Sequence, residues 1–210
     1  MSIVKLNNRG VRSATAFGSI TGLGSFKFIK KQTASSSSTV SFVHGSASVV
    51  FDSTYKEYLF TFKNIHPSAE SYFGFNMTID SGSNYNVQKT TSTFRSYHRE
   101  DGGESGVSYV SGEDLDNGTG LARLTENPQM GTNNDENLSG YLHFFNPSDT
   151  TFTKHFHGTM VSQNDDGQPG YIINFFTGGY GNTTSAVNGI QFAMGSGNID
   201  AGDICLYGLE

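Results

Sequence analysis

The sequence predicts an all-β protein, an antiparallel jelly-roll-type β-sandwich with an extended N-terminal arm. Apolar and polar residues alternate over many short segments, as in STYKEYLFTFKNIHP at 53–67. A period of two places the aromatic side chains of a strand on one face. Glycine is abundant, with 26 residues against four prolines, and it separates these segments. No segment carries a helical stripe, and no αβ alternation indicates a parallel sheet.

The first expected element is the arm, residues 1–24, whose apolar members follow no period of two or of 3.6. We expect it to pack either on the body of the protein or on a partner. Residues 25–210 are expected to form the β-sandwich domain. The arm residues expected to contact a partner are Ile3, Val4, Leu6, Arg9, Val11, Arg12, Phe17 and Ile20.

About ten to twelve strands should follow the arm, at the spacing of a sandwich or barrel. Turn residues bound them, as at 80–83, where Asp and Ser bond to their own backbone and Gly accepts a positive φ. Lys154 interrupts the apolar face between Phe152 and Phe156, and we expect it to reach an edge of the sheet or to discourage edge pairing. The expected strands lie within 24–34, 35–45, 53–67, 70–79, 92–100, 106–110, 120–124, 140–149, 152–162, 170–179, 189–197 and 203–210.

Residues 100–140 are acidic, rich in glycine and poor in apolar periodicity, so we expect long loops with one or two short strands. Within them, Asp114 and Asp116 precede Gly118 and resemble part of a calcium loop. The EF-hand pattern then fails, because Thr125 stands where the twelfth-position glutamate would be. A solvated acidic loop or a looser calcium site are the alternatives. Asp114 and Asp116 are candidates for surface recognition.

His155 and His157 are the nearest approach to a metal motif, because at i and i+2 of a strand they point the same way. A β-barrel metal site would also need a nearby carboxylate and a further histidine, which the sequence does not offer. Phe156 and Met160 would face the core, so the two histidines should face water or a partner. They are the second pair of candidates for surface recognition.

No other motif indicates catalysis or a cofactor. There is no nucleophile elbow and no phosphate or dinucleotide loop. Cys205 is the single cysteine, which excludes a disulfide framework within the chain. It lies in the terminal strand and is expected to be a small buried hydrophobe. We therefore expect a protein that is not an enzyme and holds no cofactor.

Charge is distributed unevenly within the net charge of −6. Residues 1–51 contain Lys and Arg but no acid, whereas Arg123 is the only Lys or Arg between Glu100 and Glu136, amid nine acids. This pattern would suit contact between copies or with a neighbour, and solvated charge without a partner is the alternative. We expect no nucleic-acid partner and no membrane partner, since no segment approaches the about 20 apolar residues of a membrane helix.

Four segments carry a resemblance to a known group of proteins. They are MSIVKLNNRGVRSATAFGSI at the start, STYKEYLFTFKNIHPS, IDSGSNYN, and GSGNIDAGDICLYGLE at the end. Together these resemble structural proteins of tailed bacteriophages, in particular those of marine cyanobacteria. The resemblance implies a virion component made in the host cytoplasm without a signal peptide. It also favours a partner for the arm, because virion proteins often extend a terminal segment across a neighbour.

The function expected from the sequence is therefore that of a non-enzymatic virion structural protein. We expect it in the tail, neck or fibre region, bound to other virion proteins and assembled as a homo-oligomer, with a trimer favoured. A capsid decoration protein is one alternative. A carbohydrate-binding module is another, recognising a host-surface glycan through the loops at 100–140 and nearby tyrosines.

Overall fold

The structure, a computed structural model, describes residues 26–126, 130–164 and 170–209. The predicted arm and its contact residues lie outside this part of the chain. No helix in the described ranges is long and apolar enough to cross a membrane. The elements are β1 (Lys27–Ser37), β2 (Val40–Val43), β3 (Glu57–Pro67), β4 (Phe73–Thr78), β5 (Lys89–Arg99), β6 (Ser105–Tyr109), the 3₁₀-helix η1 (Ser111–Glu113), β7 (Ala122–Arg123), β8 (Leu138–Phe145), β9 (Lys154–Asn164), β10 (Tyr171–Gly181), β11 (Gly189–Met194) and β12 (Ile199–Leu209).

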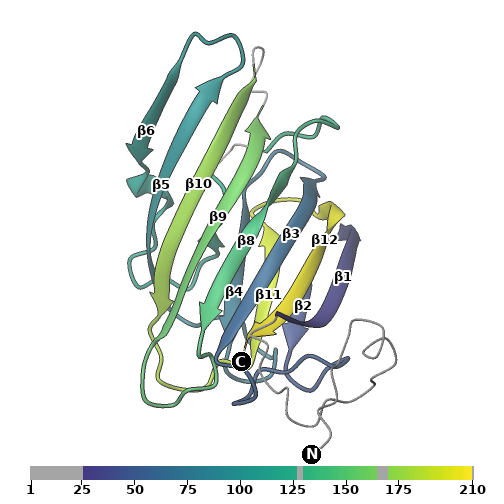
Figure 1. The fold of residues 1–210 in the computed structure, drawn as a ribbon, viewed down its shortest axis with the longest axis vertical. Coiled ribbons are helices and arrows are strands. Elements are labelled where there is room, and N and C mark those ends of the chain that lie inside the picture. Colours follow the sequence, from purple (N-terminus) through teal and green to yellow (C-terminus); the bar gives the residue numbers. More distant parts are fainter. Residues whose placement is uncertain (1–25, 127–129, 165–169, 210) are drawn as a thin grey trace, which may run out of the picture.

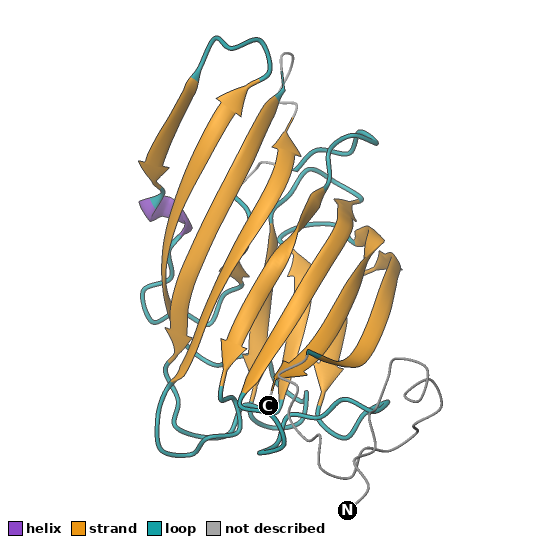
Figure 2. Ribbon diagram, in the orientation of Figure 1, coloured by secondary structure: helices purple, strands orange, loops and turns teal. Residues whose placement is uncertain are grey.

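The strands form two antiparallel sheets, so the all-β prediction is confirmed. Eight strands make one sheet, in the order β1-β12-β3-β8-β9-β10-β5-β6, and four make the other, in the order β2-β11-β4-β7. Figure 1 shows the large sheet in front with β4, β11 and β2 behind it. Figure 2 shows that η1, beside β6, is the one helical turn among the described residues.

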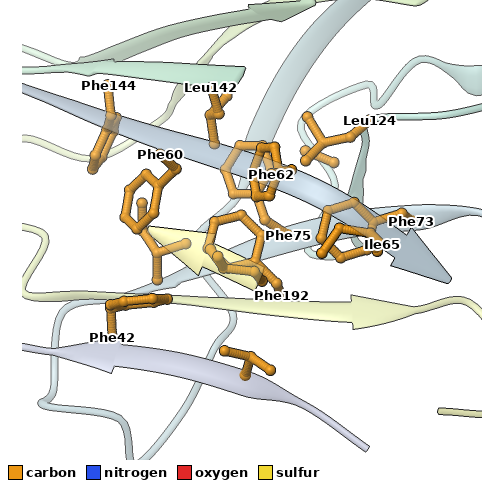
Figure 3. Packing of buried hydrophobic residues seen from close by; sticks show 14 of the residues in the cluster. Phe42, Phe60, Phe62, Ile65, Phe73, Phe75, Leu124, Leu142, Phe144 and Phe192 are labelled. Carbon is orange, nitrogen blue, oxygen red and sulfur yellow. The ribbon is translucent and has the colours of Figure 1, made fainter. Parts of the chain in front are cut away.

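Phenylalanine rings meet at the centre of the core between the sheets, in keeping with the alternation of the strands. Phe192 of β11 has the central place, with its ring centroid 5.1 Å from that of Phe60 and 5.1 Å from that of Phe62, both on β3. Its ring also stacks on Phe73 of β4 at 5.8 Å. Figure 3 shows these rings meeting between the two sheets. Edge-to-face contacts of this kind add to the stabilisation from burial alone.

The small sheet covers only part of the large one. In Figure 1, β5 and β6 lie to one side of it. The inward side of β5 is instead covered by the loop that follows β6, where the Leu115 amide donates to Thr91 Oγ1 at 2.8 Å. In the described part of 100–137 the strands are the short β6 and β7, and the remaining residues form η1 and loops.

Lys154 corrects one expectation from the sequence. It lies on β9, which is hydrogen-bonded to β8 and β10 and so is not an edge strand. The side chain points inward and is fully buried, and its Nζ donates to the Phe152 carbonyl oxygen at 2.5 Å. Because the amine finds an acceptor two residues away, it reaches no edge of the sheet.

Candidate functional site

The outward side of five neighbouring strands carries no Asp, Glu, Lys or Arg. We call this surface the uncharged face. Its positions follow from the burial alternation and the register of the strands. They are Ser139, Tyr141, His143 and Phe145 on β8, His155, His157, Thr159, Val161 and Gln163 on β9, Ile172, Asn174, Phe176, Gly178 and Tyr180 on β10, Thr90, Ser92, Phe94, Ser96 and His98 on β5, and Ser105, Val107 and Tyr109 on β6.

The absence of charge is specific to this half of the sheet. On the outward side of β3, β12 and β1 there are charged residues such as Lys63, Asp203 and Lys31. Lys31 and Asp203 form an ion pair there, at 3.2 Å. The uncharged face therefore ends at β3, where Glu57 marks its border. The Glu57 Oε2 atom lies 2.9 Å from Nε2 of His143.

At β5 the usual assignment of polar and apolar faces is reversed. Arg95 and Arg99 point inward, where Arg95 pairs with Glu126 and Arg99 donates to Asp101 at 2.7 Å. Phe94 on the opposite side of the same strand is 46% exposed. Charged groups thus lie on the inner side, where partners satisfy them, and an aromatic ring lies in solvent. Exposed apolar patches that are larger than usual for a monomer are typical of interaction sites.

Large apolar side chains are exposed across the whole face. Their exposed fractions reach 75% at Val107 and 62% at Tyr109. Depletion of charge together with enrichment in aromatic residues is the composition of the central part of protein–protein interfaces. The exposed apolar members of the face are Phe94, Val107, Tyr109, Tyr141, Val161 and Ile172.

Histidine and aromatic rings cluster at the β8 and β9 side of the face. The ring centroid of His157 lies 5.6 Å from His143 and 5.6 Å from Phe145. Tyr141 lies 6.4 Å from the same histidine, and His155 lies 6.1 Å from Tyr180. The rings offer both apolar surface and hydrogen-bonding nitrogen atoms. A ligand or partner that matches them would be neutral and partly apolar.

A shallow hollow of about 350 Å³ opens in the middle of the face. Its floor includes Gly178, and its walls include His157 and the stacked rings of Phe94 and Phe176, whose centroids are 4.5 Å apart. A Cβ atom added at Gly178 would come no closer than 3.9 Å to another residue. The hollow therefore exists because the residue is glycine, although the packing there would admit a side chain.

The four predicted recognition residues are not brought together. His155 and His157 lie on the outward side of β9, as the alternation predicts, and belong to the uncharged face. Asp114 and Asp116 follow η1, with β10 and β5 between them and β9. Within the described ranges, no group of three or more His, Cys, Asp or Glu side chains is arranged to hold a metal ion.

Asp114 is bound within the protein. Thr93 Oγ1 donates to its Oδ1 atom at 2.9 Å, and the Tyr109 hydroxyl donates to Oδ2. The hydrogen bond with Asp114 raises the pKa of Tyr109 above its usual range. This carboxylate thus holds the loop after η1 against β5 and β6, which is a structural role.

Sequence reasoning found two histidines of the uncharged face but missed the face itself. The signal is present in STFRSYHRE, where Arg95 and Arg99 alternate with Phe94 and His98. To recognise the face from this signal, one needs the order and register of five strands, which come from three separate stretches of the chain. Comparison with known proteins added nothing to this assignment, because no protein-family model, curated protein or solved structure matched the chain.

Proposed function

We propose that this chain is a non-enzymatic virion structural protein that docks through its uncharged face. We place it in the tail, neck or fibre region of a tailed phage, where it assembles with other virion proteins and with copies of itself. The observation that carries the proposal is an exposed, aromatic surface that spans five strands and has no charged residue at their outward positions. The sequence resemblance supplies the virion context.

The size of the face supports docking of a protein. About twenty outward positions, each covering about 4.8 Å by 6.7 Å of sheet, give roughly 700 Å². Specific interfaces of standard size bury about 800 Å² per partner. The face is thus large enough to form most of one such interface. Charged residues at its border, including Glu57, would then form the polar rim that gives specificity and speeds encounter.

We also propose that the fold is a jelly roll, a class that includes viral capsid domains. The pairing of the strands supports this. Without β5, β6, β9 and β10, eight strands remain, and the first pairs with the last, the second with the seventh, the third with the sixth and the fourth with the fifth. The eighth also pairs with the third, and the seventh with the fourth. The two added hairpins, β5–β6 and β9–β10, then build most of the uncharged face.

The docking proposal is tested by placing one charge on the face. Val161 is 42% exposed on β9, so Val161→Lys should leave the fold intact while placing an ammonium group inside any interface formed there. Ala201→Lys, at an exposed position of β12 outside the face, is the matched control. We expect Val161→Lys to reduce incorporation into particles at least tenfold, with an unchanged melting temperature, and the control to be incorporated normally. Normal incorporation of Val161→Lys would contradict the proposal.

A capsid decoration protein would use the same face and differs only in location. Particle images that place the protein on the capsid shell rather than on the tail, neck or fibres would decide for it. The arm, residues 1–24, remains part of the proposal, and its deletion should reduce incorporation while the body stays folded.

A carbohydrate-binding module is favoured by one observation, the hollow above Gly178. Sugar rings pack on aromatic faces, and here Phe94 and Phe176 stand beside Ser92, Thr159 and His157, which can form hydrogen bonds with hydroxyl groups. Gly178→Val would fill the hollow. Loss of neutral-glycan binding in this variant, measured by calorimetry against the unaltered chain, would support the module. Absence of binding to a broad panel of neutral glycans by the unaltered chain would exclude it.

A further inference from the structure

The free edge of β6 is where the large sheet ends. Within the described ranges no strand lies beyond it, and Figure 1 shows it at the margin of the sheet. An edge strand presents unpaired N–H and C=O groups, which can pair with another chain. A contact at this edge would use backbone groups at the margin of the sheet rather than side chains of the uncharged face, so the inference goes beyond the proposed function.

The backbone groups that face outward at this edge can be identified. The Val110 amide donates to the Thr93 carbonyl at 3.1 Å, and the Arg99 amide donates to the Glu104 carbonyl at 2.8 Å. In an antiparallel ladder, the residues that bond to the neighbouring strand alternate with residues whose N–H and C=O point away. Positions 104, 106, 108 and 110 therefore face β5. Ser105, Val107 and Tyr109 direct both backbone groups to the free edge.

The two edges of the sheet differ in how they oppose pairing. At the other edge, β1 carries Lys27, Lys30 and Lys31, and its register shifts between Phe28 and Lys30. Lysine side chains and bulges are the usual devices that prevent edge-to-edge association. β6 has the sequence SGVSY, without charge or proline, and its register with β5 is continuous. Of the two edges of the large sheet among the described strands, the β6 edge therefore lacks such protection. Its strand carries Val107, the most exposed valine of the uncharged face.

We propose that β6 pairs with β6 of a second copy of this chain, antiparallel and about a two-fold axis through Val107. Val107 then faces Val107 of the second copy, and Ser105 faces Tyr109. Because these three residues have outward backbone groups, each facing pair exchanges two hydrogen bonds, about six in all. The strand is self-complementary, since its centre is apolar and neither end of it carries a charge.

The surroundings of β6 permit this pairing. Glu104 accepts hydrogen bonds from the hydroxyl groups of Tyr97 and Tyr171, at 3.2 and 3.1 Å, and Asp114 is held by Thr93 and Tyr109. These carboxylates are engaged within their own subunit rather than extended across the edge. The remaining acids nearby have the same sign in both copies, so the association should strengthen as salt screens them. Pairing would join the two uncharged faces into one continuous surface.

The experiment measures the mass of the full chain in solution by analytical ultracentrifugation. We expect an even number of copies, either two, or six if the predicted trimer also forms. Val107→Lys sets two ammonium groups opposite each other and should raise the dissociation constant of the two-fold contact at least tenfold. Phe28→Lys, at a 61% exposed position on the β1 edge, is the matched control and should keep the original mass. A monomer or an odd order for the unaltered chain, or an unchanged mass for Val107→Lys, would overturn the proposal.

Hydrogen exchange provides a second readout that a change in folding would not imitate. At high protein concentration the amides of Ser105, Val107 and Tyr109 should exchange slowly, and on dilution they should exchange fast, while those of Gly106 and Ser108 stay protected throughout. The same fast exchange at every concentration would refute pairing. The uncharged face is assayed separately, because the Val161→Lys variant should no longer be incorporated into particles but should still form the two-fold pair.

Discussion

Lys89 should make the stability of this protein depend on pH in an unusual direction. The side chain lies on the inward side of β5 with no exposed surface. Its Nζ donates to Asn76 Oδ1 at 2.6 Å and to the Val87 carbonyl oxygen at 2.9 Å, both neutral acceptors. Burial without an anionic partner penalises the charged amine and lowers the pKa of Lys89 to about 8.

The direction and size of the effect follow from this pKa. In the unfolded chain a lysine keeps its ordinary pKa of about 10.5, so between pH 8 and that value the unfolded state binds more protons than the folded state. Stability therefore rises with pH across this window, and below it the full penalty is present. At about 1.4 kcal/mol per pH unit, the penalty amounts to about 3 kcal/mol.

The test compares urea unfolding of the unaltered chain and of Lys89→Met at several values between pH 7.5 and pH 10. The free energy of unfolding of the unaltered chain should rise by about 2–3 kcal/mol relative to the variant across this range. Comparing slopes rather than absolute stabilities avoids a complication, because methionine also leaves Asn76 and Val87 without a donor, at a cost that does not vary with pH.

One further group affects the same curves. Burial also lowers the pKa of Lys154, which lies in the same cross-strand row, with Gly181 between it and Lys89. Its contribution has the same sign but is present in both proteins, so it largely cancels. Lys56→Met, at an exposed lysine, is the matched control and should run parallel to the unaltered chain. Parallel curves for Lys89→Met would refute the assignment of a buried, proton-binding amine.

Three other predictions test the packing and the loop after β6. Gly140→Ala should lower the free energy of unfolding by about 1–3 kcal/mol, because the added Cβ would lie 2.8 Å from the Met160 Cα. Gly178→Ala should change it by less than about 0.5 kcal/mol, because the space there is open. Equal effects of the two variants in chemical denaturation would contradict this. Phe192→Ala should cost about 3–5 kcal/mol in the same assay, since it removes the ring at the centre of the core, and a loss below about 1 kcal/mol would contradict that place. Asp114→Asn should lower the pKa of Tyr109, followed by the absorbance of tyrosinate, and an unchanged titration would show that this hydrogen bond is absent.

The strands themselves could be predicted from the sequence because their alternation is local. In 57–67 and 154–164 the buried positions fall at every second residue over most of the strand, as the spacing of Phe60 with Phe62 and of Phe156 with Met160 indicates. The turn at 80–83 was equally readable, since Asp80 accepts hydrogen bonds from Thr78 and Asn84 as turn chemistry predicts.

The partition into a wide and a narrow sheet could not be predicted, because it depends on pairings between distant segments. β1 pairs with β12 at the other end of the chain, and β5 pairs with β10 rather than with β4, which directly precedes it. The uncharged face depends on these pairings, so two of its histidines were found and its extent was not. Lys154 was misread for the same reason, since nothing local shows that β9 has a neighbour on each side.

The connection of β5 to the rest of the sheet constrains how the chain can be synthesised and folded. Within the large sheet, β5 and β6 are joined to the other strands only through β10, which is translated about seventy residues later. At 5–20 residues per second, β5 waits roughly 4–14 s on the ribosome before its partner emerges. Its serine, threonine, arginine and histidine residues make that waiting strand polar, and charged side chains oppose pairing with other chains. Slowing translation between the two strands would prolong this interval, so codon usage there should affect the yield of native protein more than codon usage elsewhere.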